Sequence, residues 1–263
     1  MKIVITGASK GIGFAIAQAL VSNGHTVFSI SRTAPSPCTG IKHIACDIGS
    51  RESVTAAFSE IFKHTPHIDV LINNAGIGIA GTVEHTNTDD LQKIFNVNFN
   101  GAVWATQQVI PAMRKNGAGK IIFISSMGSI FTLPFQTFYS ATKNAINSLA
   151  EGLRLELKPF NIQVSSLLLG DIRSDFTQNR CTNFESPEYG NRLKNSLAVI
   201  EHDELNGMSS EYVGKQIARY ITKKHLSPYK IFGLQYKLFY LLNKLLPKRI
   251  VLYITYKMYG GEK

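Results

Sequence analysis

Short apolar runs alternate with longer stretches of helical periodicity along most of the chain. The apolar runs are rich in Val, Ile and Leu, as expected of parallel strands that are covered on both faces. We predict strands at residues 2–6, 26–31, 41–46, 70–73, 120–125 and 163–169. Between them, apolar residues spaced three and four apart predict helices at residues 12–22, 53–63, 89–115 and 138–158.

This order of elements predicts the class of fold. Strands that alternate with helices give an α/β fold with a doubly wound, Rossmann-like parallel sheet and helices on both faces. The length of 263 residues suits a single domain of this kind. Ligands of such sheets bind beyond the carboxyl ends of the strands, so we expect the functional residues at that edge.

A glycine-rich turn joins the first predicted strand to the first predicted helix. Gly7, Gly11 and Gly13 follow a GxxxGxG spacing. Glycines allow a tight turn and let backbone N–H groups approach a pyrophosphate at the N-terminus of a helix. The motif alone leaves a second interpretation open, in which the turn serves only close packing.

The end of the second predicted strand distinguishes between nicotinamide cofactors. NAD sites commonly carry an acidic residue there to hold the ribose hydroxyls, whereas this chain has Ser31 and Arg32. Arg32, helped by Lys10, would suit the 2′-phosphate of NADP(H), unless both are ordinary surface cations. Asp47, just after the third strand, is placed either to bind the adenine amino group or to cap the following helix.

A tyrosine, a lysine and a serine form the candidate catalytic group. Tyr139 and Lys143 are four residues apart and therefore share one face of the predicted helix 138–158. A free tyrosine has a pKa near 10, and a neighbouring ammonium group would lower that pKa toward neutral pH. Ser126 directly follows the fifth predicted strand, where it would donate a hydrogen bond to a substrate oxygen beside Tyr139.

With these motifs in order, residues 2–175 resemble the short-chain dehydrogenase/reductase family in its single-domain, NADP(H)-preferring form. The resemblance implies a catalytic tetrad in which Ser126 holds the carbonyl oxygen and Tyr139 donates the proton. Lys143 would bind the nicotinamide ribose and lower the Tyr139 pKa, and Asn98 would help to order a proton-relay water. The matching features are the turn 6–13, Asp47, the turn 73–76, Asn98 in the segment 98–101, Ser126, Tyr139 and Lys143.

The sequence departs from the family after the sixth strand. Where the family usually has Pro-Gly, this chain has Leu169-Gly170, and the missing proline leaves the backbone contact to the nicotinamide open. The predicted cofactor-binding residues are Gly7, Ser9, Lys10, Gly11, Ile12, Gly13, Ser31, Arg32, Asp47, Ile48, Asn74, Ala75, Gly76, Tyr139, Lys143, Gly170, Ile172 and Ser174.

Residues 175–210 would, by the same resemblance, form a mobile lid over the substrate. The lid contains Phe176, Phe184, Tyr189, Leu193, Leu197 and Val199, which favours an apolar ketone or alcohol over a sugar or a charged acid. Steroid-like, long-chain keto-lipid and keto-acyl substrates all remain open. The resemblance also implies a homodimer or homotetramer that pairs through helices around residues 102–115 and 138–158.

Net charge singles out the end of the chain. Residues 1–211 carry 17 basic and 17 acidic residues, whereas residues 212–263 carry 11 basic residues and one acid, Glu262. We predict a catalytic domain at residues 1–233 and a basic, amphipathic helical tail at 234–263. Leucines at helical spacing, with aromatic residues and lysines beside them, predict either peripheral membrane contact through residues 234–259 or packing on the enzyme or another subunit. Nucleic acid is excluded as a partner because no reading motif accompanies the charge.

Composition narrows the remaining possibilities. Cys38, Cys46 and Cys181 form no CxxC pair, and the histidines show no metal-ligand spacing, so we expect no disulfide and no metal. The chain starts in an apolar strand with no signal peptide before it, which favours a cytoplasmic location. The predicted function is therefore NADP(H)-dependent interconversion of a lipophilic ketone and a secondary alcohol. The alternative function is a protein that senses NADP(H) or acts as a scaffold without turnover.

Overall fold

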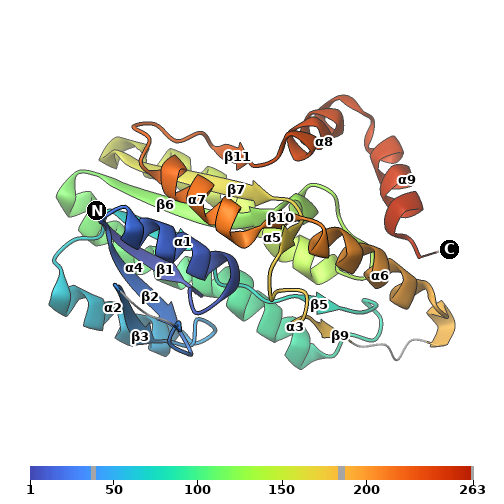
Figure 1. The fold of residues 1–263 in the computed structure, drawn as a ribbon, viewed down its shortest axis with the longest axis horizontal. Coiled ribbons are helices and arrows are strands. Elements are labelled where there is room, and N and C mark those ends of the chain that lie inside the picture. Colours follow the sequence, from blue (N-terminus) through green and yellow to red (C-terminus); the bar gives the residue numbers. More distant parts are fainter. Residues whose placement is uncertain (37–39, 183–186, 262–263) are drawn as a thin grey trace.

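A parallel sheet of seven strands forms the centre of the molecule (Figure 1). The computed structural model describes residues 1–36, 40–182 and 187–261, to which this count applies, so Cys38, Phe184 and Glu262 lie outside the described residues. The strand order is β11-β7-β6-β4-β1-β2-β3. These strands are β1 (Lys2–Thr6), β2 (Thr26–Ser31), β3 (Ile41–Ala45), β4 (Val70–Asn73), β6 (Gly119–Ser126), β7 (Ile162–Leu169) and β11 (Tyr229–Ile231).

All six predicted strands are confirmed to within one residue at each end. The prediction missed β11, a three-residue strand that pairs in parallel with β7 through Tyr229 and Ser166. A strand this short has too few residues to show a hydrophobic period. The chain order reverses between β1 and β4, and in a doubly wound sheet this is where a ligand-binding crevice opens.

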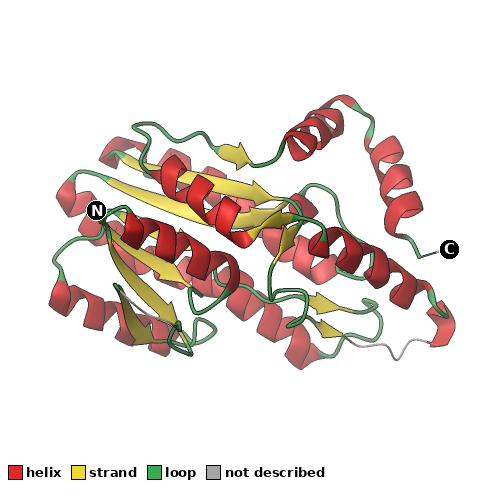
Figure 2. Ribbon diagram, viewed as in Figure 1, coloured by secondary structure: helices red, strands yellow, loops and turns green. Residues whose placement is uncertain are grey.

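Helices cover both faces of the sheet, which confirms the predicted doubly wound fold (Figure 2). On one face α1 (Gly11–Ser22) and α7 (Ser210–Ile221) bury Ile16 and Ile217 against β1 and β4. On the other face α2 (Arg51–His64), α4 (Gly101–Asn116) and α5 (Thr137–Glu156) bury Phe58, Val109 and Ile146. The sheet is thus apolar on both faces, and its polar ligand edge is at the strand ends.

The helix predicted at residues 89–115 is continuous in the structure, but it consists of three segments, and the prediction missed the middle one. These are α3 (Thr88–Phe95), a π-helical turn (Asn96–Asn100) and α4. The Asn98 side chain donates to the Ile77 carbonyl oxygen (3.0 Å) and accepts from the Ile77 N–H (2.8 Å). The turn therefore places Asn98 against the loop after β4, and π-helical turns often mark functional sites in this way.

Smaller elements surround the ligand edge of the sheet. In the lid segment β9 (Cys181–Thr182) pairs with β5 (Ile79–Ala80), and α6 (Arg192–Leu205) follows. Just after β7, β8 (Ile172–Arg173) pairs with β10 (Met208–Ser209). Short 3-10 turns lie at Met127–Ser129, Lys158–Phe160 and Pro187–Tyr189.

Two helices end the chain and stand apart from the sheet layers (Figure 1). They are α8 (Leu234–Leu245) and α9 (Lys248–Tyr259), separated by Pro247. Among the described residues, none of the helices is both long and apolar enough to cross a membrane. Of the cysteines that the structure describes, Cys46 is buried and Cys181 is exposed, and both are free thiols.

Candidate active site

The turns after β1 and β4 pack directly on each other. A Cβ atom at Gly7 would lie 2.8 Å from the Ala75 Cα, and one at Gly13 would lie 2.4 Å from the Asn74 Nδ2. The Thr6 hydroxyl oxygen accepts hydrogen bonds from the N–H groups of Asn74 and Ala75, each at 2.9 Å. Glycine is therefore required at these two positions by the close approach of two backbones.

The N-terminus of α1 opens toward the same crevice. Its N-cap residue, Lys10, has an extended backbone, and none of the described side chains caps the helix. Gly11 has a φ of +59°, and a Cβ there would meet only the Ser174 side chain, at 3.8 Å. This side-chain-free cradle of N–H groups fits a pyrophosphate group. The Lys10 ammonium donates to the Asn179 Oδ1 at 2.8 Å, which ties the glycine turn to the lid.

The residues proposed for the adenosine end lie at the carboxyl ends of β2 and β3. Arg32 is exposed, directly after β2. The Asp47 carboxylate accepts a hydrogen bond from the Gly49 N–H (3.0 Å). The side chain that caps α2 is Ser50, which accepts from the Ser53 N–H. The interpretation of Asp47 as the helix cap is therefore wrong, whereas its adenine contact stays a prediction.

Ser126, Tyr139 and Lys143 come together where β6 ends beside α5. The Ser126 hydroxyl accepts from the Gly128 N–H (3.0 Å) and forms a hydrogen bond with the Tyr139 hydroxyl. The Lys143 ammonium donates to the Ile124 carbonyl oxygen at 2.8 Å and lies 5.8 Å from the centre of the Tyr139 ring. The strand end and one turn of helix thus bring a serine hydroxyl and a phenol to one point, with a cation nearby.

The acidity of this group differs from the sequence expectation. Burial raises the pKa of Tyr139 to about 12, against the opposing effect of the hydrogen bond from Ser126. Burial also lowers the pKa of Lys143 to about 8. The expected lowering of the Tyr139 pKa by Lys143 is therefore wrong for this arrangement, because desolvation of the phenol outweighs the charges around it.

Asn98 lies behind the catalytic candidates. Besides its two hydrogen bonds to Ile77, its amide donates to the Thr142 hydroxyl at 3.1 Å. Only 2% of Asn98 is exposed. The side chain therefore joins the loop after β4 to α5, one residue before Lys143, and its role in ordering a water stays a prediction.

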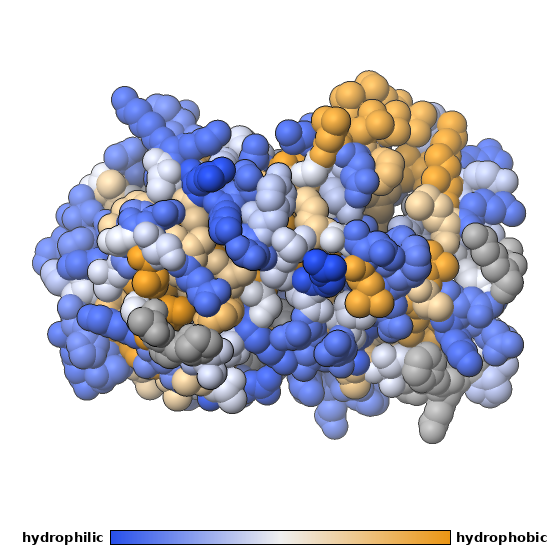
Figure 3. Space-filling model, viewed as in Figure 1, coloured by the Kyte–Doolittle hydropathy of each residue, from blue (hydrophilic) through white to orange (hydrophobic). Residues whose placement is uncertain are grey.

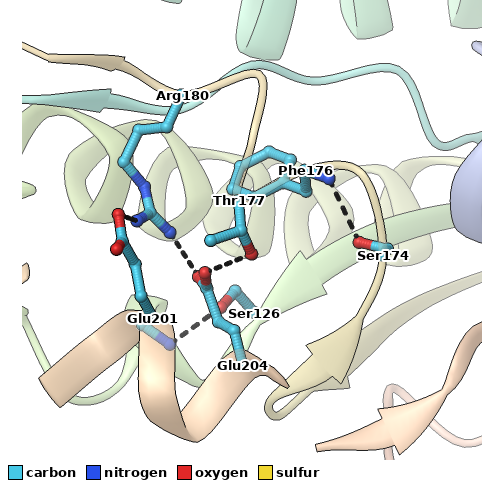
Figure 4. Close-up of polar contacts among 8 residues, drawn as sticks. Ser126, Ser174, Phe176, Thr177, Arg180, Glu201 and Glu204 are labelled. Carbon is cyan, nitrogen blue, oxygen red and sulfur yellow. Dashed lines mark hydrogen bonds and ion pairs between the residues drawn. The ribbon is translucent and has the colours of Figure 1, made fainter. Parts of the chain in front are cut away.

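The first part of the lid closes over Tyr139. The Phe176 ring lies 5.5 Å from the Tyr139 ring, centre to centre. Arg180 is buried, forms an ion pair with Glu204 of α6, and lies 3.7 Å from Glu201 (Figure 4). These contacts hold the first part of the lid against α6, which belongs to its second part. The pairing of Arg180 with Glu204 could not be predicted from the sequence, because residues 24 positions apart share no local pattern.

The loop after β7 makes a contact with the tail that the sequence did not predict. The Tyr236 hydroxyl at the start of α8 donates to the Asp171 carboxylate (2.8 Å) and accepts from the Asp171 N–H (2.9 Å). A Cβ at Gly170 would lie 2.2 Å from the Tyr236 ring, so the ring covers this glycine. Burial raises the pKa of the Asp171 carboxyl, and the Tyr236 hydrogen bond opposes that rise. The loop in which the family's usual proline is missing is therefore the loop that Tyr236 of the tail contacts.

One cleft of about 820 Å³ connects all of these features. All the predicted cofactor-binding residues line it, as do Ser126, Tyr139 and Lys143, whereas Asn98 does not. The end beyond Tyr139 is lined mainly by apolar side chains, although Gln136, Glu204 and Asn243 also line the cleft. Its walls are Met127, Phe131, Leu133, Phe176 and Ile200 from the body, with Phe239, Leu242, Leu246, Val251, Ile254 and Met258 from α8, α9 and their junction. The tail is therefore part of the cleft wall, which the sequence alone left open.

Comparison with known proteins agrees with this geometry. The family model of the short chain dehydrogenases matches residues 1–184. A 3-ketodihydrosphingosine reductase of Bacteroides thetaiotaomicron is 37% identical, over 85% of this chain and 84% of that protein. A probable short-chain type dehydrogenase/reductase of Helicobacter pylori is 32% identical, over 93% and 92% of the two chains. Among solved structures, a short-chain dehydrogenase from Streptomyces avermitilis superposes with a TM-score of 0.84 at 26% identity, covering 100% of this chain and 98% of the other.

Proposed function

The chain belongs to the short-chain dehydrogenase/reductase family, and on that premise we propose that it reduces a lipophilic ketone to a secondary alcohol with NADPH. A nicotinamide-dependent oxidoreductase is what the family membership establishes. The observation that carries the finer proposal is one continuous cleft. It has a glycine cradle at one end, Ser126 and Tyr139 in the middle, and apolar walls at the other end.

In the proposed reaction each side chain has a separate task. The Ser126 hydroxyl donates a hydrogen bond to the ketone oxygen and holds it beside Tyr139. The Tyr139 O–H bond breaks and its proton goes to that oxygen, while the carbonyl carbon receives a hydride. Lys143 provides a cation near the phenolate that forms, and Asn98 positions the Lys143 helix through Thr142. A positioned acid of this type contributes about 10²–10⁴-fold to a rate.

The residues present fit an NADP(H) cofactor. The uncapped α1 N-terminus and the open cradle at Gly11 suit its pyrophosphate. Arg32 suits its 2′-phosphate, because β2 ends without the acidic residue that NAD sites use. Lys10 would assist only if its hydrogen bond to Asn179 of the lid is exchanged. When bound, the reduced nicotinamide supplies the hydride.

The pKa of Tyr139 supports the reductive direction. At about 12, the pKa keeps the phenol protonated at neutral pH, and a protonated phenol is the form that can donate to a ketone oxygen. Alcohol oxidation needs the ionised form, which burial disfavours. Oxidation should therefore be the slower direction near pH 7.

The apolar end of the cleft supports a substrate with a long hydrocarbon portion. Its lining contains aromatic and aliphatic side chains from three different parts of the chain, namely β6–α5, the lid and the tail. The Bacteroides relative is named for a long-chain 3-ketone. A keto-lipid is accordingly the substrate class that we propose, ahead of a steroid-like or keto-acyl substrate.

We also propose the remaining features of the organisation. These are a catalytic domain at residues 1–233 with its lid at 175–210, a tail at 234–263, and a homodimer or homotetramer. Peripheral contact with a membrane through residues 234–259 is part of the same proposal. The alternative function, NADP(H) sensing or scaffolding without turnover, would not need the three side chains that meet at Tyr139.

Oxidation of NADPH with a panel of short- and long-chain ketones tests the function, with NADPH binding measured in parallel. Tyr139→Phe should lose turnover by about 10²–10⁴-fold while it still binds NADPH. Tyr212→Phe, in which an exposed tyrosine of α7 loses the same hydroxyl, is the matched control and should retain full activity. Equal turnover in both variants would refute the role of Tyr139, and no turnover of any ketone by the wild type would favour the sensor.

A further inference from the structure

The tail helices expose an apolar surface that is unusual for a folded chain. Large side chains on both helices face solvent, with 70% of Leu245 and 62% of Tyr253 exposed. In Figure 3 this surface is the hydrophobic region at the upper right, over α8 and α9. Its outward members include Leu234, Leu238, Leu241, Leu245, Leu252 and Tyr253. Contiguous apolar surface of this kind marks a contact with another apolar body.

The tail is anchored at its two ends, and between them the Lys248 ammonium also donates to the Ile130 carbonyl oxygen (3.5 Å). Tyr236 holds the start of α8 on the loop after β7 through its two hydrogen bonds to Asp171. At the other end, the Tyr259 hydroxyl donates to the Asp203 carboxylate at 3.1 Å, and Arg192 donates to the Gly260 carbonyl oxygen at 3.2 Å. The helices therefore form an arch over the mouth of the cleft.

The outer surface of the arch continues into the cleft. Phe239, Leu242, Ile254 and Met258 line the cleft, yet between 38% and 47% of each residue is exposed. These side chains thus form an apolar mouth between the outside of the arch and the substrate end of the cleft. A hydrocarbon chain could move along this surface without crossing water.

The charge of α8 and α9 distinguishes between a lipid surface and a second copy of the chain as the partner of this apolar surface. Residues 234–261 contain five exposed cations, Lys237, Lys244, Lys248, Arg249 and Lys257, and no acidic residue. Two copies of the chain pressed together here would bring ten cations face to face with nothing to neutralise them. Anionic lipid headgroups would neutralise them, and basic, aromatic helices bind such surfaces.

The dimensions and the aromatic residues agree with a position in the interface of a membrane. Each helix has 12 residues and is about 18 Å long, whereas a hydrocarbon core is about 30 Å thick. Lys244 lies 4.6 Å from the centre of the Tyr240 ring, and Lys257 lies 5.8 Å from that of Tyr253. Tyrosines beside lysines are typical of the headgroup level of a bilayer.

We propose that the arch of α8 and α9 inserts its apolar surface into an anionic lipid leaflet, and that the mouth beneath it is the portal through which the ketone enters from the bilayer. The portal rests on the proposed function, because it requires a lipophilic substrate. Docking specifies the peripheral membrane contact proposed above, and it rests on the exposed surface and its charge without requiring any particular substrate. The two steps can therefore be measured separately.

Flotation of the full chain with vesicles tests docking. Vesicles of phosphatidylcholine and phosphatidylglycerol in equal parts should carry the protein, and vesicles of phosphatidylcholine alone should carry much less. Leu241→Gln with Leu245→Gln, which lie outside the cleft lining, should weaken binding about tenfold or more. The matched control is Val83→Gln with Tyr212→Gln, where 56% and 52% of the residues are exposed, and its binding should be unchanged.

Two results would overturn docking: the wild type could fail to float, or both double variants could lose binding equally. If the wild type fails to float, the oligomer of each variant is then measured on a sizing column, where the Leu241/Leu245 variant could form a smaller oligomer than the wild type. That result would assign the surface to contact between copies of the chain.

Turnover by the same two double variants tests the portal. With a long-chain 3-ketone embedded in the anionic vesicles, the Leu241/Leu245 variant should be about tenfold slower than the control variant. With a short, water-soluble ketone the two should be equal. Equal rates on the embedded ketone would refute the portal. If the wild type floats but reduces neither ketone, the proposed function fails while docking stands.

Discussion

The two ends of the cleft are built in opposite ways. At the cofactor end, backbones approach so closely that a single added carbon at Gly13 would lie 2.4 Å from its neighbour. At the tail end, the walls are large side chains on two helices, and residues such as Phe239 are 42% exposed. Backbone contacts shape the first end, whereas partly exposed side chains shape the second. Under the proposed function, reaction class and substrate class are therefore encoded by different kinds of structure.

The largest expected effect comes from a substitution at the cofactor end of the cleft. Gly13→Ala would place a Cβ 2.4 Å from the Asn74 Nδ2 and 2.5 Å from the Gly7 carbonyl oxygen. Because the obstacle includes backbone, the two turns must separate, and the affinity for NADPH should fall about a hundredfold or more. Isothermal titration of NADPH measures this.

Gly152→Ala is the matched control for that variant. Gly152 lies inside α5, and an added Cβ would meet nothing within 4 Å. The control should bind NADPH normally and should be stabilised by about 0.5–1 kcal/mol, because alanine favours the helix. Normal NADPH binding by Gly13→Ala would show that the cofactor end tolerates variation as the tail end does.

A second prediction uses the buried cation of the catalytic group. The pKa of Lys143 is about 8 in the folded protein and 10.5 as its ordinary value. Between these pH values the unfolded chain binds more protons than the folded chain, so the free energy of unfolding increases as pH rises. Below pH 8 the buried charge of Lys143 lowers the free energy of unfolding by on the order of 3 kcal/mol.

Chemical unfolding at several pH values measures this effect. The difference in unfolding free energy between wild type and Lys143→Met should grow in favour of the wild type from pH 8 to pH 10. Lys244→Met, which removes an exposed lysine of the tail, should show a constant difference from the wild type. A constant difference for Lys143→Met as well would mean that its ammonium is not desolvated.

The sequence patterns predicted the cofactor end of the cleft better than the tail end. The strands and the glycine turn have local signals, namely apolar runs and fixed spacings, and the topology of the sheet then brings their ends together. Asp47 shows the limit of such signals, because two local roles were equally compatible and only the structure identified Ser50 as the cap. The π-helical turn at Asn98 was not predicted, because the Asn98 side chain forms its hydrogen bonds with Ile77, 21 residues away in the sequence.

The tail shows why the remaining part could not be predicted. Its helices were predictable from their periodicity, but what they touch was not. The ring of Tyr236 covers Gly170 and its hydroxyl bonds to Asp171, 65 residues away. Such a contact depends on the whole fold. The predicted lowering of the Tyr139 pKa was wrong for a related reason. The desolvation of a side chain depends on everything that packs around it.

A third prediction concerns the cofactor end and changes only the preference for NADPH over NADH. Arg32→Ala should raise the KM for NADPH about 10- to 100-fold and leave the KM for NADH unchanged, because only NADPH carries the 2′-phosphate. Steady-state kinetics with both cofactors measures this. Arg51→Ala removes another exposed arginine, one outside the cleft, and should change neither constant. Equal effects on both cofactors would remove the basis for the NADP(H) assignment.

The smallest expected effect concerns Tyr236, which joins the two ends. Tyr236→Phe keeps the ring over Gly170 but removes the hydroxyl that serves both the N–H and the carboxylate of Asp171. Losing these partners in a mostly buried site should cost about 1–2 kcal/mol and lower the Tm by about 2–4 °C. Tyr253→Phe, at a tyrosine that is 62% exposed, should leave the Tm unchanged. If Tyr236→Phe also raises the KM for NADPH, the tail and the loop after β7 act as one unit, and if Tm and KM both stay unchanged, the two ends of the cleft are independent.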